Sequence, residues 1–269
     1  MCSRSARWAS WLLLLILVVA CAKVPITGRS QLNLIPASML YPMSFEQYDA
    51  FLAEHPVSDD ADRVAMVKRV GQRLQHAVER FYAERGQRGA LRNYAWEFHL
   101  VENEQVNAWC MPGGKVVVYT GLLPVAEGEA GLAVVMGHEI AHAIAEHGNE
   151  RMSQALLTQL GGVALSKALE EKPQETRALF LGAYGVGTQV AVLLPYSRLH
   201  ESEADHLGMI FMALAGYDPH EAVAFWQRMT AAKSGPAPPE FLSTHPSDQA
   251  RIENLRELIP EAMDYYRQR

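Results

Sequence analysis

The sequence predicts a mostly α-helical domain of the α+β class with a small β-sheet. Its 269 residues are 49% hydrophobic and 20% charged, which is enough apolar material for one large domain with a buried core. After Pro124, apolar residues recur at helical spacing almost to the C-terminus. Before that point, two short runs rich in β-branched and aromatic residues predict strands.

The individual elements follow from these periodicities. A first helix is expected to start near the cap candidates Ser58 and Asp59 and to continue through Phe81. Gly148 and Gly216 stand where C-terminal helix caps are expected. Strands are predicted at 94–100 and 116–120, and helices near 127–147, 150–170, 175–194, 198–215, 219–231 and 247–259. The proline-rich stretch 233–246 is predicted to be a loop.

The first 20 residues have the pattern of a bacterial lipoprotein signal peptide. Arg4 and Arg7 precede an unbroken apolar run from Trp11 to Ala20, which is too short to span a bilayer comfortably. The run ends in Val-Val-Ala-Cys, which resembles a lipobox, so cleavage before Cys21 would leave a lipidated cysteine at the mature N-terminus. The alternative is an uncleaved N-terminal anchor with an incidental cysteine.

The expected location is the outer membrane of a Gram-negative bacterium, on its periplasmic face. Ala22 follows Cys21, and the absence of an aspartate there resembles the sorting pattern of outer-membrane lipoproteins. Several acyl chains on Cys21 would anchor the protein stably to the membrane. The net charge of -6 gives no indication of a basic surface, so no nucleic-acid partner is expected.

The segment His138-Glu139-Ile140-Ala141-His142 predicts a zinc site. Residues four apart project from one face of a helix, so both imidazoles can bind one zinc ion. Glu139 lies about 60° around the helix from His142, so its carboxylate can act on the attacking water without ligating the metal. A catalytic zinc needs a third protein ligand, and the acidic residues of 201–205 supply candidates on another predicted helix.

The chain resembles metallopeptidase family forty-eight, which contains CaaX prenyl proteases, HtpX-type proteases and periplasmic outer-membrane-assembly proteases. The resemblance lies in five segments that occur in the family's order: 27–32 (TGRSQL), 107–114 (NAWCMPGG), 138–147 (HEIAHAIAEH), 197–205 (SRLHESEAD) and 243–246 (STHP). These segments extend from near Cys21 almost to the C-terminus. The resemblance implies a gluzincin metalloprotease domain with a small sheet beside the zinc helix.

The resemblance also implies the remaining site residues. In gluzincins the third ligand is a glutamate, and the family spacing selects Glu201 as the ligand with Asp205 as its companion. Glu203 is the competing choice, but only Glu201 and Asp205 share a helix face. Glu139 is then the catalytic base, and Asp205 either orients a ligand histidine or donates a proton.

Three further expectations concern the surroundings of the site. His245 is a candidate removable fourth ligand that keeps the enzyme latent, or else it orders its loop or contacts substrate. The strand 116–119 is either an exposed edge that can bind an extended peptide or part of an ordinary hairpin. The uncharged stretch 178–194 is expected to be a buried helix packed through its glycines, with membrane contact as the alternative.

The sequence therefore predicts a zinc metalloendopeptidase with one Zn²⁺ per chain. The expected organisation is a signal peptide at 1–20, a tether at 21–57 and a zinc metallopeptidase domain at 58–269. The expected substrates are unfolded or misassembled envelope proteins. The alternative function is a chaperone-like assembly factor with little or latent proteolysis.

Overall fold

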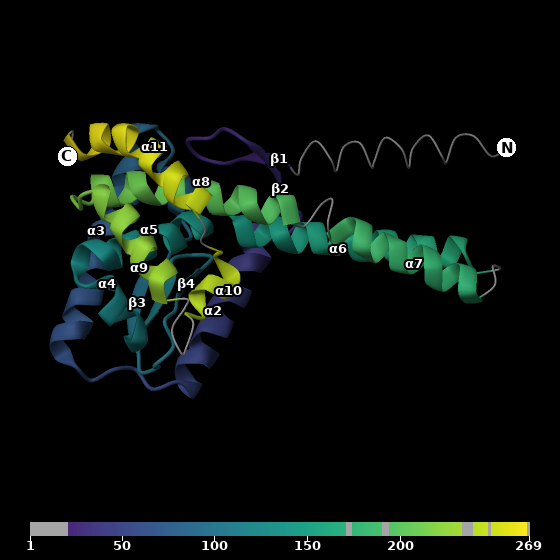
Figure 1. Ribbon diagram of the computed structural model, residues 1–269, viewed down its shortest axis with the longest axis horizontal. Coiled ribbons are helices and arrows are strands. Elements are labelled where there is room, and N and C mark those ends of the chain that lie inside the picture. Colours follow the sequence, from purple (N-terminus) through teal and green to yellow (C-terminus); the bar gives the residue numbers. More distant parts are fainter. Residues whose placement is uncertain (1–20, 171–173, 190–193, 233–238, 247–248, 268–269) are drawn as a thin grey trace. The chain divides into compact units, whose positions relative to one another are not determined.

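The computed structural model describes residues 21–170, 174–189, 194–232, 239–246 and 249–267 (Figure 1). The predicted signal peptide lies outside these residues. The chain forms two compact units. The smaller unit contains residues up to 37 together with 146–198, and the larger contains 38–145 together with the chain from 199 onwards.

The larger unit is built around a three-stranded sheet. Its order is β3 (Glu97–Val101), β5 (Lys115–Tyr119) and β4 (Ala108–Met111), with β3 parallel and β4 antiparallel to β5. All five residues of β5 are buried, and its apolar run Val116–Tyr119 is of the kind expected at the centre of a sheet. The prediction of an exposed edge at 116–119 is therefore wrong, and β4 is an edge strand instead.

Two long helices precede the sheet in sequence. In α3 (Ala61–Glu84) the side chain of Asp60 caps the N-terminus by accepting the backbone N–H of Arg63 at 3.1 Å, one residue after the predicted cap. In α2 (Ala37–Glu54) the fully buried Tyr48 packs with Val101 and Val117 of the sheet. The sequence did not predict α2, because Pro36 and Pro42 made this stretch resemble a polar lead-in.

The remaining helices confirm a mostly helical domain with a small sheet. They are α4 (Leu123–Ala126), α5 (Glu129–Ile144), α8 (Leu194–Leu214), α9 (His220–Ala232), α10 (Phe241–Thr244) and α11 (Gln249–Arg267), with short 3₁₀ turns η1 (Arg88–Leu91) and η2 (Thr120–Leu122). Gly216, with φ 85°, follows α8 as predicted. The cap predicted at Gly148 is wrong: α5 ends at Ile144, and the left-handed residue is Glu146, with φ 52°.

The smaller unit contains the antiparallel pair β1 (Cys21–Lys23) and β2 (Ser30–Leu32) with the helices α6 (His147–Ala168) and α7 (Gln174–Thr188) (Figure 1). Helices α6 and α7 pack against each other. No helix among the described residues of either unit has the length and apolar character needed to cross a membrane.

The prediction that 178–194 is buried through its glycines is wrong for the described part of that stretch. A Cβ built on Gly182 or Gly185 meets no atom within 4 Å. The close contact comes from α6 instead, where a Cβ on Gly161 would lie 2.2 Å from the hydroxyl of Tyr184. The side chain of Phe180 is 51% exposed.

Candidate metal centre

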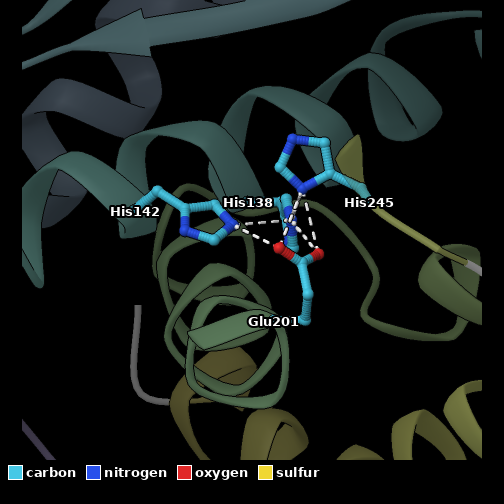
Figure 2. A group of neighbouring side chains, drawn as sticks. All are labelled: His138, His142, Glu201 and His245. Carbon is cyan, nitrogen blue, oxygen red and sulfur yellow. Dashed lines mark hydrogen bonds and ion pairs between the residues drawn. The ribbon is translucent and has the colours of Figure 1, made fainter. Parts of the chain in front are cut away.

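Helix α5 presents two imidazoles to one point. It is apolar along almost its whole length and buried from Gly131 to Ile144, so its polar side chains are fixed inside the unit. His138 and His142 are one turn apart, and their Nε2 atoms lie 3.1 Å from each other (Figure 2). Both side chains are buried.

Helix α8 carries the third member of the group, Glu201, against α5. Two glycines allow this close approach: a Cβ on Gly137 would lie 3.1 Å from the carbonyl oxygen of Gly208, and a Cβ on Gly208 would lie 3.0 Å from the backbone nitrogen of His138. The Glu201 carboxylate oxygens lie 3.3 Å from the Nε2 atoms of His138 and His142.

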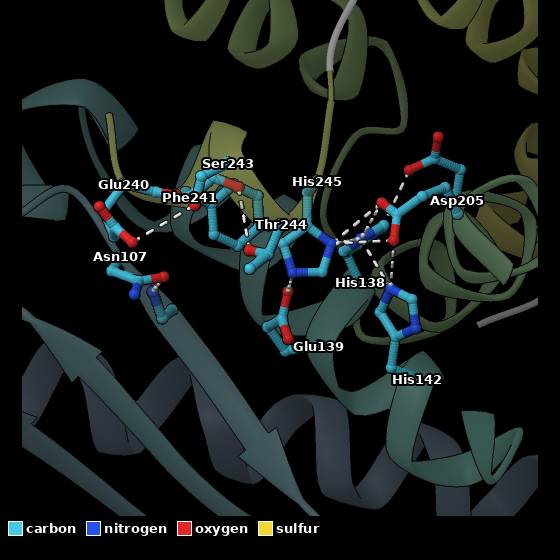
Figure 3. A network of polar contacts seen from close by, with 12 residues as sticks. Asn107, His138, Glu139, His142, Asp205, Glu240, Phe241, Ser243, Thr244 and His245 are labelled. Atoms are coloured by element: carbon cyan, nitrogen blue, oxygen red, sulfur yellow. Dashed lines mark hydrogen bonds and ion pairs between the residues drawn. The ribbon is translucent and has the colours of Figure 1, made fainter. Parts of the chain in front are cut away.

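His245 completes the group from the segment that follows α10. Its Nδ1 lies 2.9 Å from Glu201 Oε2 and 3.2 Å from His138 Nε2 (Figures 2 and 3). The predicted loop at 233–246 is helical at Phe241–Thr244, and His245 leaves that helix with φ -123° and ψ 77°. This non-helical conformation is consistent with the restriction that Pro246 imposes on the preceding residue.

The four residues fit a zinc ion. Their donor atoms, three imidazole nitrogens and one carboxylate oxygen, lie within 4.8 Å of one another. Tetrahedral ligands about 2.0–2.1 Å from zinc are about 3.3 Å apart, close to the separations of 2.9–3.3 Å found here. Among the described residues, this group includes Glu201 and does not include Glu203.

Glu139 lies beside this group without belonging to it. Its side chain is buried on α5, and its Oε1 is 3.5 Å from Nε2 of His245 (Figure 3). His245 therefore lies between Glu139 and the other three members, with one ring nitrogen facing each. This position separates the expected base from the expected metal site.

Asp205 contacts the ring nitrogen of His138 that faces away from the group. Its Oδ1 lies 3.0 Å from His138 Nδ1. Asp205 and Glu201 are four residues apart on α8, so they share the face that meets α5. A carboxylate on the second nitrogen of an imidazole fixes the tautomer and the ring orientation, which is the arrangement expected behind a metal ligand.

Arg251, at the start of α11, is a site residue that the sequence reasoning missed. Its guanidinium donates two hydrogen bonds to Asp205, at 2.8 and 2.7 Å, and one to the carbonyl of Pro246 at 3.1 Å. It also lies 3.2 Å from Glu201 Oε2 and over the ring of Trp226, 3.4 Å from the centroid. A lone arginine in a predicted amphipathic helix gives no signal of such burial.

The groups around the site keep its carboxylates ionised. Burial alone would raise the pKa of Glu201, but hydrogen bonds from His138, His142 and His245 hold it well below its usual value. The pKa of Asp205 is likewise lowered, because Arg251 and His138 outweigh its burial. For His138, burial lowers the pKa, but hydrogen bonds to Asp205 and Glu201 outweigh it and raise the pKa to about 9. The negative charges of Glu201 and Asp205 thus attract positive charge to this group of side chains.

Comparison with known proteins agrees with this geometry. The profile of Peptidase family M48 matches residues 68–259, which include all the site residues described above. Mitochondrial metalloendopeptidase OMA1 of Schizosaccharomyces pombe is 32% identical over 250 residues, covering 89% of this chain and 66% of that protein. The human Metalloendopeptidase OMA1, mitochondrial, is 33% identical, with 89% and 46% covered.

A bacterial protein matches as well. The Beta-barrel assembly-enhancing protease of Escherichia coli is 30% identical over 166 residues, covering 60% of this chain and 34% of that protein. The chain thus aligns with about one third to two thirds of the length of these relatives. The predicted family resemblance, the gluzincin fold and the use of zinc are confirmed. The chain belongs to peptidase family M48 and contains the zinc metalloendopeptidase domain of that family.

Proposed function

We propose that this protein is a lipid-anchored zinc metalloendopeptidase that hydrolyses unfolded or misassembled proteins on the periplasmic side of the outer membrane. The observation that carries the proposal is the convergence of His138, His142 and Glu201 on one point, with Glu139 beside them. The test is cleavage of an unfolded protein by the purified, zinc-loaded chain.

In this proposal His138, His142 and Glu201 hold the zinc ion. Zinc, when bound, supplies a Lewis acid that polarises the scissile carbonyl and makes water more acidic. Glu139 accepts the proton of the attacking water and passes it to the leaving amine. Asp205 orients the His138 ring through its Nδ1, a role that the 3.0 Å contact supports over proton donation. Arg251 holds Asp205 in place.

The substrate is proposed to bind in an extended conformation along β4. This strand is an edge of the sheet and packs against α5, the helix that carries His138 and Glu139. An extended peptide can add to such an edge through backbone hydrogen bonds, which do not depend on its side chains. This mode suits a protease that acts on unfolded chains of varied sequence.

His245 is proposed to keep the resting enzyme latent. Its Nδ1 faces the three ligands and its Nε2 faces Glu139, so it occupies the space that the water and the scissile carbonyl need. The ring of Phe241 stacks on His245 with centroids 4.4 Å apart, and the backbone N–H of Phe241 donates to Val106, just before β4. Four protein ligands make a closed zinc site, whereas catalysis needs an open position.

The variant His245→Ala is expected to keep its zinc and to cleave unfolded substrates faster. Three protein ligands remain, and removal of the fourth opens a coordination position. We expect a rise in turnover of about tenfold, which corresponds to about 1.4 kcal/mol of closure energy removed. Turnover should be measured on samples whose zinc content has been determined.

The neighbouring variant Ser243→Ala is the matched control, because the Ser243 hydroxyl bonds to Glu240 within its own segment. It should behave like the wild type. Unchanged or lower turnover of His245→Ala at full zinc occupancy would contradict latency and favour a structural or substrate-binding role. If the zinc site keeps all four protein ligands in every condition, the chain does not hydrolyse peptides. That result would match the alternative function, a chaperone-like assembly factor.

The membrane anchor is proposed from the N-terminal sequence. Arg4, Arg7 and the apolar run before Cys21 support secretion and lipidation, and Ala22 supports sorting to the outer membrane. The name of the Escherichia coli relative refers to β-barrel assembly, which supports an envelope role. The names of the mitochondrial relatives refer to another compartment, so location needs a direct test.

The variant Cys21→Ser is expected to lose all lipid label and to leave the membrane fraction if the signal peptide is still removed. The reason is that the acyl chains are attached to this cysteine. Metabolic labelling with a fatty-acid analogue measures the attachment directly. Cys110→Ser serves as the control and should keep the label. Equal labelling of the wild type and Cys21→Ser would refute the lipoprotein proposal.

A further inference from the structure

Helix α6 has an exposed apolar face that the proposed function does not explain. Met152, Leu156, Leu160 and Val163 are 39%, 43%, 56% and 61% exposed, and we call these four residues the α6 stripe. Their spacing of four, four and three residues places them within about 80° of the helix circumference and over about 16 Å of its length. Single exposed apolar residues are ordinary, whereas a continuous row over three turns indicates an interaction surface.

Helix α6 also makes contacts that hold its own unit together. The Ser153 hydroxyl accepts the backbone N–H of Leu34 at 2.9 Å. Farther along α6, the carbonyl of Thr158 accepts the hydroxyl of Tyr184 in α7 at 3.0 Å. Leu156, Leu160 and Val163 lie farther along α6 than Ser153, and their side chains remain exposed.

In the sequence, the apolar N-terminal segment ends directly before β1, which belongs to the same unit as α6. That segment, Trp11–Ala20, stops directly before Cys21, the first residue of β1. Arg29, the residue before β2, contacts α6: its guanidinium donates two hydrogen bonds to the buried carboxylate of Glu150, at 2.9 and 2.7 Å. A membrane anchor at Cys21 thus joins the compact unit that carries the α6 stripe.

We propose that the α6 stripe inserts into the interfacial region of the lipid bilayer to which the chain is anchored. This inference rests on the proposed membrane anchor, whether it is lipid on Cys21 or an uncleaved apolar segment. A helix that lies in the interface buries one apolar face at the boundary of headgroups and acyl chains. Lys167 follows the stripe by one turn and is exposed, so its ammonium can reach the headgroups while its stem lies along the apolar face.

A photo-crosslinking residue placed at position 160 of the full chain in native membranes tests this proposal. We expect a phospholipid adduct at position 160 and at least about tenfold less at position 155, because Ala155 lies about 140° away around α6. Ala155 is exposed too, so the two positions differ in direction and not in accessibility. A protein adduct at position 160, from a partner or a second copy, would overturn the proposal.

Two further outcomes distinguish a failure of the stripe proposal from a failure of the anchor proposal. If the chain sediments with membranes and position 160 gives no lipid adduct, the stripe proposal is wrong and the anchor stands. If the chain does not sediment with membranes, the anchor proposal is wrong. The stripe is then tested by flotation with phosphatidylethanolamine and phosphatidylglycerol vesicles. Leu160→Glu should lower the bound fraction about tenfold relative to Ala155→Glu, and equal flotation of the two variants would refute the proposal.

Discussion

Replacement of Glu139 by glutamine is expected to abolish measurable peptide hydrolysis while zinc stays bound. The amide keeps the size of the side chain but cannot accept the proton of the attacking water. General base catalysis contributes about a hundredfold to ten-thousandfold, so turnover should fall by that factor. Zinc should remain because Glu139 does not belong to the group of candidate ligands. The measurement is turnover of an unfolded model substrate, with zinc determined on the same sample.

Glu139→Asp provides the matched comparison for this variant. Aspartate keeps a carboxylate but sets it back by one methylene, so this variant should be slower than the wild type and faster than Glu139→Gln. The order wild type, aspartate, glutamine would separate loss of the base from a general disturbance of α5. Near-normal turnover of Glu139→Gln would remove Glu139 from its proposed role.

Removal of the Glu201 carboxylate is expected to cost both the metal and the activity. In Glu201→Ala the group loses its one negatively charged donor, which lies within 3.3 Å of His138 and His142. Changes behind a metal ligand cost about 10–100-fold in affinity, so loss of a ligand should cost more than about a hundredfold. Zinc content after dialysis against a weak chelator measures this directly.

Glu203→Ala is the control for this experiment. Glu203 is buried on the same helix but lies outside the group of candidate ligands, so this variant should retain zinc. Circular dichroism of both variants should show that α8 remains folded. Zinc loss in Glu203→Ala together with zinc retention in Glu201→Ala would make Glu203 the ligand.

Part of this site could be read from the sequence because it is local. The positions of His138, Glu139 and His142 on one helix follow from helical geometry and from the apolar residues around them. The approach of Glu201 is not local: it depends on Gly137 and Gly208, which let α5 and α8 meet closely. Glycine is common, and no periodicity in the sequence marks these two as facing each other.

Neither the burial of Arg251 behind the site nor the strand order of the sheet could be predicted from the sequence. Arg251 is buried only because Asp205, Glu201 and the Pro246 carbonyl surround it, and these groups come from distant parts of the chain. The strand 115–119 was predicted correctly as a strand but not as the central one. Its partner β3 pairs with it in parallel, and such a crossover connection leaves no local signal.

The most direct test of the central claim is the identification of new protein N-termini by mass spectrometry. Unfolded envelope proteins should be incubated with the zinc-loaded wild-type chain or with zinc-loaded Glu139→Gln. If the chain is a zinc metalloendopeptidase that uses Glu139, internal N-termini will appear with the wild type and be absent with the variant. Equal sets of termini from the two samples would contradict this account of the protein.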